Sequence, residues 1–110
     1  MLFCLTAKYT PKALNAMLEN PSADRKAAAE KLVTAAGGKL VGFYGTIADG
    51  PGVLAIFDID PVGAGAINGT VSSTDGVHDV KMQRLLSGDD VMAIRKKRAE
   101  IQGSYKAPGK

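Results

Sequence analysis

The order of strand-like and helix-like segments most constrains how this 110-residue chain can fold. Four segments alternate in the manner of β-strands, at residues 2–9, 39–47, 53–59 and 77–86. Helical segments separate the first strand from the second and the third from the fourth, whereas only the glycine- and proline-rich turn at 48–52 joins the second to the third. The order β-α-β-β-α-β, followed by a last helix, predicts an α+β ferredoxin-like fold with one antiparallel sheet and both main helices on one face.

Local signals define the first helical region. Thr10 followed by Pro11 opens it, because the hydroxyl accepts an unpaired amide and proline suits the first helical position. Pro21 interrupts it, and we expect Ser22 to cap a second piece that runs through residues 27–36. Gly37 then supplies the left-handed residue that ends this piece.

The next helix is predicted to open at Asp60 and to be weak on its own. Its three glycines each cost roughly 0.5–1 kcal/mol relative to alanine. These glycines are Gly63, Gly65 and Gly69. Such small residues suggest that another helix or subunit packs closely against this helix. A last helix is predicted to follow Ser87 and Asp90, which match a capping box.

The predicted sheet carries apolar side chains on both of its faces. Residues 2–9 and 53–59 show this most clearly, because neither alternating set in them is fully polar. Helices cover one face, and an uncovered apolar sheet on a monomer would be large enough to mark an interface. The sequence therefore predicts that the chain forms a homo-oligomer through its sheet.

Positive charge is concentrated at the end of the chain. Residues 95–110 hold six basic residues and one acidic residue, a net charge of +5, whereas residues 1–94 carry −2. Tyr105 is the one aromatic residue near these charges, which argues against a nucleic-acid surface. We expect one domain over 1–94, followed by a basic helix end and tail over 95–110 whose last eight or so residues are mobile or dock on a neighbouring subunit.

Composition excludes several classes of function. With 45% hydrophobic and 23% charged residues, the chain is typical of one ordinary domain without a membrane span. Its first residues lack the pattern of a signal peptide, so we expect a cytoplasmic protein. A single cysteine, Cys4, and a single histidine, His78, argue against a metal site and an internal disulfide, and no motif suggests a cofactor.

The chain resembles the GYD-domain family of small bacterial proteins. The resemblance rests on the helix AAAEKLVTAAGGKL, the aromatic pair Phe43 and Tyr44, and the strand GVLAIFDID. It extends from LFCLTAKYT to VHDVKMQRLLSGDDVMAI, or about residues 2–94. The resemblance implies a dimeric α+β barrel, in which two ferredoxin-like sheets face each other. It implies no catalytic residues, because the family's biochemical role is largely unassigned.

The sequence also departs from the family pattern. The turn at 48–53 has no tyrosine where the family tends to carry its glycine-tyrosine-aspartate triplet, and it contains an extra proline. Residues 20–24 form an insertion, and the basic tail follows residue 94. Any role of the family's turn tyrosine therefore does not transfer to this chain.

Four residues are candidates for a functional site, and each has a structural alternative. His78 can exchange protons near neutral pH, or it can decorate a strand edge. Tyr44 can point into a pocket or pack in the barrel. Cys4 can bind a ligand as a thiolate if a cation lies nearby, and otherwise fills the core. Asp49 can reach a neighbouring site or hydrogen-bond its own turn.

Two classes of function remain open from the residues. The first is a homo-oligomer that binds a small molecule or serves as an assembly module. The second is a cofactor-free isomerase or monooxygenase, in which a pocket between sheet and helices holds a small organic substrate and His78 or Tyr44 moves a proton. A deep pocket that contains either residue would favour the enzyme, and a filled core would favour the first class.

Overall fold

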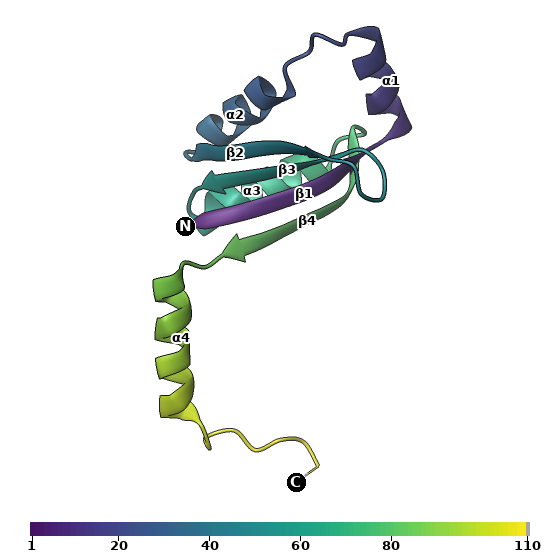
Figure 1. Cartoon of the computed structure of the whole chain (residues 1–110). Coiled ribbons are helices and arrows are strands. Elements are labelled where there is room, and N and C mark those ends of the chain that lie inside the picture. The colour runs from purple at the N-terminus through teal and green to yellow at the C-terminus, as the bar shows by residue number, and fades with distance from the viewer. Residues whose placement is uncertain (110) are drawn as a thin grey trace.

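A computed structural model describes residues 1–109 as one antiparallel sheet with a helical layer on one face (Figure 1). The elements are β1 Leu2–Tyr9, α1 Pro11–Glu19, α2 Arg25–Ala35, β2 Lys39–Thr46, β3 Gly52–Asp58, α3 Pro61–Ser72, β4 Val77–Leu85 and α4 Gly88–Ile101. The strand order in the sheet is β2-β3-β1-β4. This arrangement confirms the α+β ferredoxin-like fold class.

The helices begin where their capping signals predict, with one exception. The side chains of Thr10 and Asp60 accept the backbone N–H three residues on, at 3.2 Å and 2.6 Å. Ser87 and Asp90 form a complete capping box, each side chain accepting the backbone N–H of the other at 3.0 Å and 3.1 Å. These local hydrogen bonds satisfy amides that a helix start leaves unpaired.

The predicted cap at Ser22 is wrong. Asp24 is the N-cap of α2, and its carboxylate accepts the N–H of Ala27 at 3.0 Å. Ser22 lies instead inside a turn closed by the hydrogen bond from the Ala23 N–H to the Asn20 carbonyl at 3.1 Å. Proline favours the second position of such a turn, so the chain completes the turn before the helix can start.

The core lies between the sheet and α2 and α3. Phe57 is 1% exposed, and its ring stacks on Phe3 with 6.5 Å between centroids. Leu5 from β1, Val33 from α2 and Ile67 from α3 complete the same buried cluster. Successive residues of a strand face opposite sides of the sheet. The residues before and after Phe3, Leu5 and Phe57 in the sequence therefore lie on the face that points away from α2 and α3.

The strict alternation expected for residues 39–47 is broken by an irregularity in β2. Leu40 pairs with Phe57 and Phe43 pairs with Ala55, so both side chains point toward the helices although they are three residues apart. The register shifts between Leu40 and Gly42. A bulge of this kind inserts one residue and turns the following side chains to the other face.

One of the three glycines of α3 is explained by close packing. A Cβ on Gly63 would lie 2.5 Å from the Cδ1 atom of Ile59 and 2.9 Å from the carbonyl oxygen of Ala36. The same addition at Gly65 or Gly69 would meet nothing within 4 Å apart from the backbone of α3 itself and the adjacent residues. Within one chain the close packing expected along the helix therefore occurs near its start, and packing of a neighbouring subunit on the other two glycines stays a prediction.

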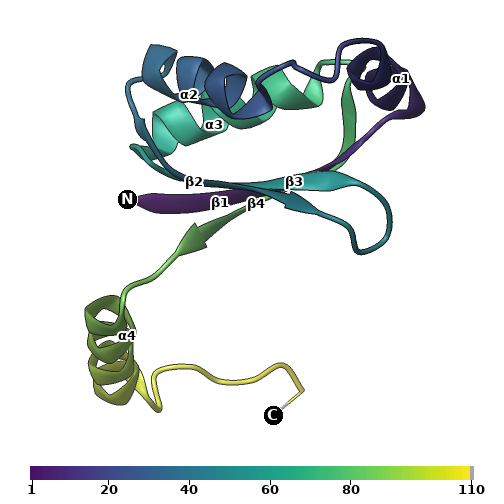
Figure 2. The same cartoon turned by 45° about the horizontal axis from the view of Figure 1, so that its top comes forward.

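Helix α4 stands apart from the rest of the molecule. Figures 1 and 2 show it beyond the end of β4, on the side of the sheet opposite α1, α2 and α3. None of its residues is buried. The radius of gyration is 18.0 Å, whereas a compact domain of this length has about 13 Å. Met92, Ile94 and Ile101 are each more than half exposed.

Deleting residues 105–110 is expected to leave the thermal midpoint nearly unchanged. Tyr105 is 73% exposed, and surface residues of this kind contribute within about 0.5 kcal/mol of stability. The expectation for the tail extends to Lys110, which lies outside the described residues. Scanning calorimetry of the full and shortened chains measures the effect. A fall of many degrees would instead identify the tail as a structural strap.

Candidate functional site

A cavity of about 440 Å³ opens between the sheet and the helices. It lies where β1 ends at Tyr9 and β4 begins at Val77, and α1 and α3 form its sides. A second space of about 130 Å³ continues inward toward Phe57. Both spaces share Tyr9, Leu32 and Val77 as walls, so together they form one site with an outer and an inner part.

The break between α1 and α2 and a set of small side chains create this space. Asn20 has non-helical angles (φ −132°, ψ 73°) because the proline that follows it disfavours helix. The two helices are consequently separated by a loop, whose Asn20 and Ala23 line the cavity. Alanines make up much of the remaining wall. They are Ala13 and Ala16 in the outer part and Ala7, Ala28, Ala29 and Ala55 in the inner part.

Arg25 is the one charged residue among the described residues that line the two parts of the cavity. It lies at the first position of α2 and borders both the outer and the inner part. Tyr9, Thr70 and Thr74 add polar atoms to the outer part. The site is therefore apolar inside and carries one cation, which is the usual composition of a small-molecule site with few polar anchors.

The opposite face of the sheet is not covered by α1, α2 or α3 and is largely apolar at its centre. It carries Cys4, Leu54 and Ile56, as the pairing of β1 with β3 places them. Tyr44 extends this surface on β2 and is 60% exposed. At one edge, Asp79 lies 3.7 Å from the amines of both Lys8 and Lys81. We call this surface, made by the outward residues of the four strands, the open face.

A model of the GYD domain matches residues 3–94. The chain belongs to the GYD domain family. No curated protein matches the chain closely enough to add a biochemical role. The GYD match ends inside α4, so the second half of that helix and the basic tail lie beyond it.

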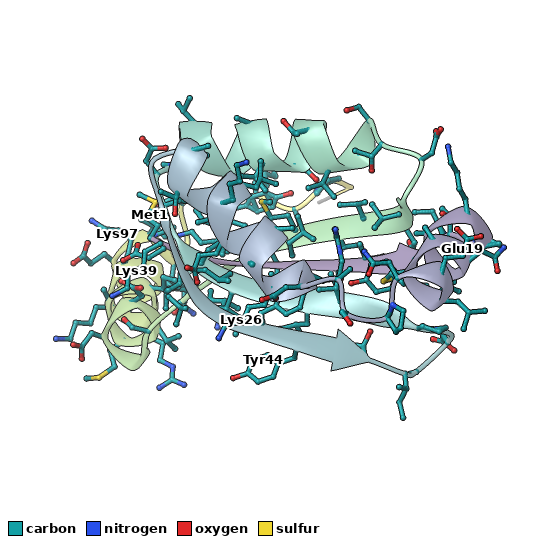
Figure 3. All side chains as sticks on the ribbon, turned by 90° about the horizontal axis from the view of Figure 1, so that it is seen from above. Met1, Glu19, Lys26, Lys39, Tyr44 and Lys97 are labelled. Atoms are coloured by element: carbon teal, nitrogen blue, oxygen red, sulfur yellow. The ribbon has the colours of Figure 1, made fainter. Side chains whose placement is uncertain are left out.

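The GYD-domain structure places His78 and Tyr44 on opposite edges of the sheet. His78 is exposed on β4 opposite Lys8, and therefore lies on the open face. Tyr44 lies on β2, the other edge strand (Figure 3). The structure does not bring these two candidates together, and neither lines the cavity between sheet and helices.

Cys4 and Asp49 likewise do not line this cavity. Cys4 is 6% exposed on the open face, and desolvation by burial raises the pKa of its thiol. A raised pKa keeps sulfur in the less reactive thiol form. Asp49 lies in the turn between β2 and β3 with a left-handed φ of 57°, a conformation that aspartate tolerates better than most residues. Their ligand-binding roles stay predictions.

Sequence reasoning missed Arg25 and Tyr9. The available signal for Arg25 was its place directly after the inserted segment 20–24, at the start of a helix in which alanines occupy consecutive positions. The signal for Tyr9 was its alternation with Leu5 and Ala7, which places it on the helix side of the sheet. Both signals concern position in the fold rather than reactive chemistry.

Residues 1–109 contain neither a metal-binding group of side chains nor a membrane-spanning helix. No group of three or more histidine, cysteine, aspartate or glutamate side chains lies close enough together there to hold a metal ion. None of the helices formed by these residues combines the length and the apolar character needed to cross a bilayer.

Replacing His78 by asparagine is expected to leave ligand binding in the cavity unchanged. The side chain is exposed and lies outside the cavity, so the substitution removes no contact within it. A thermal-shift screen run in parallel on the wild type and on His78→Asn tests this. Compounds should stabilise both proteins equally, and a compound that stabilises only the wild type would place His78 in a binding site.

Proposed function

We propose that this protein is a homo-oligomeric α+β-barrel protein that binds a small organic molecule in the cavity behind its sheet. The observation that carries the proposal is the contrast between the two faces of one sheet. One face encloses a cavity beneath the helices, whereas the other carries the half-buried apolar side chains of Leu54 and Ile56, which α1, α2 and α3 do not cover. A second copy of the chain, packed face to face, is the cover we propose.

The chemistry of the open face supports a second copy as its partner. Leu54 and Ile56 lie at its centre, and the charged residues Lys8, Asp79 and Lys81 lie toward one edge. An apolar centre with a polar rim is the usual composition of a protein interface. A two-fold axis would place the centre of one open face against the centre of the other, so that apolar side chains meet.

The size of the open face supports a role for α4 in the same interface. Four strands of about eight residues each cover roughly 500 Å², or roughly 1,000 Å² for two copies. Stable interfaces bury about 1,200–2,000 Å² in total. The sheets alone supply too little area. Helix α4 lies on the open side of the sheet, and its exposed Met92, Ile94 and Ile101 would supply the remainder against the partner.

We favour binding over turnover because of the groups that face the cavity. None of the described lining residues is a histidine, aspartate or glutamate, and the guanidinium of Arg25 does not give up its proton. General acid-base catalysis most often uses histidine or a carboxylate within hydrogen-bond reach of the substrate. No specific observation supports the isomerase or monooxygenase alternative.

Sedimentation velocity at micromolar concentration tests the assembly. We expect the full chain to sediment as a multiple of 11.4 kDa, and a chain lacking residues 105–110 to form the same multiple of its own smaller mass. In a chain lacking residues 88–110, the remaining helices and strands should keep their circular dichroism signal. This shortened chain should nevertheless dissociate at a higher protein concentration than the full chain does. A full-length sample that contains only an 11.4 kDa species would overturn the assembly.

A further inference from the structure

We propose that the ligand of this cavity is an organic carboxylate with an apolar body, whose carboxylate pairs with Arg25 at the entrance. This inference rests on the proposed function and adds the chemical class of the ligand. It combines three observations: the charge of one lining residue, the apolar walls on either side of it, and the volume available.

Arg25 is free to bind an anion from outside the chain. It takes part in none of the ion pairs formed within residues 1–109. The adjacent acid, Asp24, is occupied at the helix end by its hydrogen bond from the Ala27 N–H at 3.0 Å. A guanidinium presents several donors in a planar fork that matches the two oxygens of a carboxylate. The one cation of the lining is therefore suited to an anionic head group.

The walls inside Arg25 suit a hydrocarbon body. The inner part extends past Leu32 and Val33 to Phe57, and none of its lining residues besides Arg25 carries a charge. Burial of apolar surface gives about 25 cal/mol per Å², so an alkyl or aryl group gains free energy by entering. An inorganic anion would gain nothing from these walls and would leave them empty. The ligand therefore needs both an anionic end and an apolar end.

The volume limits the ligand to a small molecule. The outer part measures about 440 Å³ and the inner part about 130 Å³. Small-molecule sites generally measure about 300–1,000 Å³. Tyr9 and Thr70 at the outer part can donate further hydrogen bonds to the carboxylate. A medium-length carboxylate therefore fits the site with its head at Arg25 and its tail toward Phe57.

Octanoate and octanol are a matched pair of probes, because they share a chain and differ in charge. We expect octanoate to bind the wild type at least about tenfold more tightly than octanol, with amide NMR shifts centred on Leu32 and Val77. Arg25→Gln should weaken octanoate binding about tenfold or more and leave octanol binding unchanged, since a charge-assisted hydrogen bond is lost. Arg25→Lys should retain part of the preference.

Two further variants separate the site from general attraction to a basic protein. Lys26→Gln removes the neighbouring charge, which does not line this cavity, and should leave octanoate affinity unchanged. Ala29→Phe places a ring in the inner part, where the proposed tail lies, and should abolish binding of both probes. Octanoate binding that survives Ala29→Phe unchanged, or that falls equally in Lys26→Gln, would overturn the proposal.

The two probes also distinguish the failure of this inference from that of the proposed function. Equal binding of octanol and octanoate, unaffected by Arg25→Gln, would overturn the carboxylate and leave a small-molecule site in place. No binding of either probe would overturn both the carboxylate and the ligand-binding part of the proposed function. The sedimentation measurement tests the assembly independently of either result.

Discussion

Replacing Leu54 by aspartate is expected to convert the proposed oligomer into 11.4 kDa monomers. Leu54 lies on β3 at the centre of the open face. It pairs with Thr6 on β1 and with Tyr44 on β2, the two strands that flank β3. In a single copy Leu54 is half-buried on a face that α1, α2 and α3 leave open, so the new carboxylate can still reach water, and the sheet loses about 1 kcal/mol in strand preference. Between two sheets it would be buried without a partner, which costs several kcal/mol. Sedimentation velocity and circular dichroism together measure dissociation and retained folding.

The matched control introduces the same charge on the other side of the molecule. Val62 on α3 is 82% exposed, and Val62→Asp should leave the size of the oligomer unchanged. Substitutions at Ile56 and Tyr44 extend the test across the open face. If Leu54→Asp, Ile56→Asp and Tyr44→Asp all sediment like the wild type, the copies do not pair through their sheets, whatever other assembly they form.

Short-range signals predicted most of the fold. Thr10, Asp60 and Ser87 each cap a helix through an amide only three residues away, so the relevant hydrogen bond is visible in the sequence. The cap at Ser22 was wrong because two adequate caps, Ser22 and Asp24, compete within three positions. The turn around Pro21 decides between them, and that choice depends on how the loop closes.

Two features could not be predicted from the sequence: the register of β2 against β3, and the separation of α4 from the rest of the molecule. The bulge in β2 turns Leu40 and Phe43 to the same face, and only the register with β3 reveals it. The separation of α4 from the body likewise cannot be read from residues 88–101, whose capping box and apolar residues are also typical of a packed helix. Both depend on what lies beside the segment rather than on the segment itself.

The candidate site was harder to predict than the fold because its defining property is unfilled volume. A search for reactive side chains finds His78, Tyr44, Cys4 and Asp49 by their chemistry, without regard to where a space exists. The cavity arises instead because alanines from β1, α1, α2 and β3 face one another. Their convergence requires the folded arrangement, and so does the position of Arg25 beside it.

Replacing Phe57 by alanine is expected to cost about 3–5 kcal/mol of unfolding free energy, the range for removing a buried aromatic ring. Phe57 is 1% exposed and loses its stacking contact with Phe3. Since small domains are stable by about 5–15 kcal/mol, the variant loses a large part of its stability. Urea unfolding at one fixed protein concentration measures the change, because the stability of an oligomer depends on concentration.

The control for this substitution is Val62→Ala, which removes an apolar side chain that is 82% exposed and should change stability by about 0.5 kcal/mol or less. The two variants compare buried with exposed apolar surface on the same side of the sheet. Phe57 also borders the inner part of the cavity, so removing its ring enlarges that part. A loss below about 1 kcal/mol would mean that the neighbouring side chains collapse into the vacated volume. The core around the cavity would then be too deformable to hold the inner space open for a ligand.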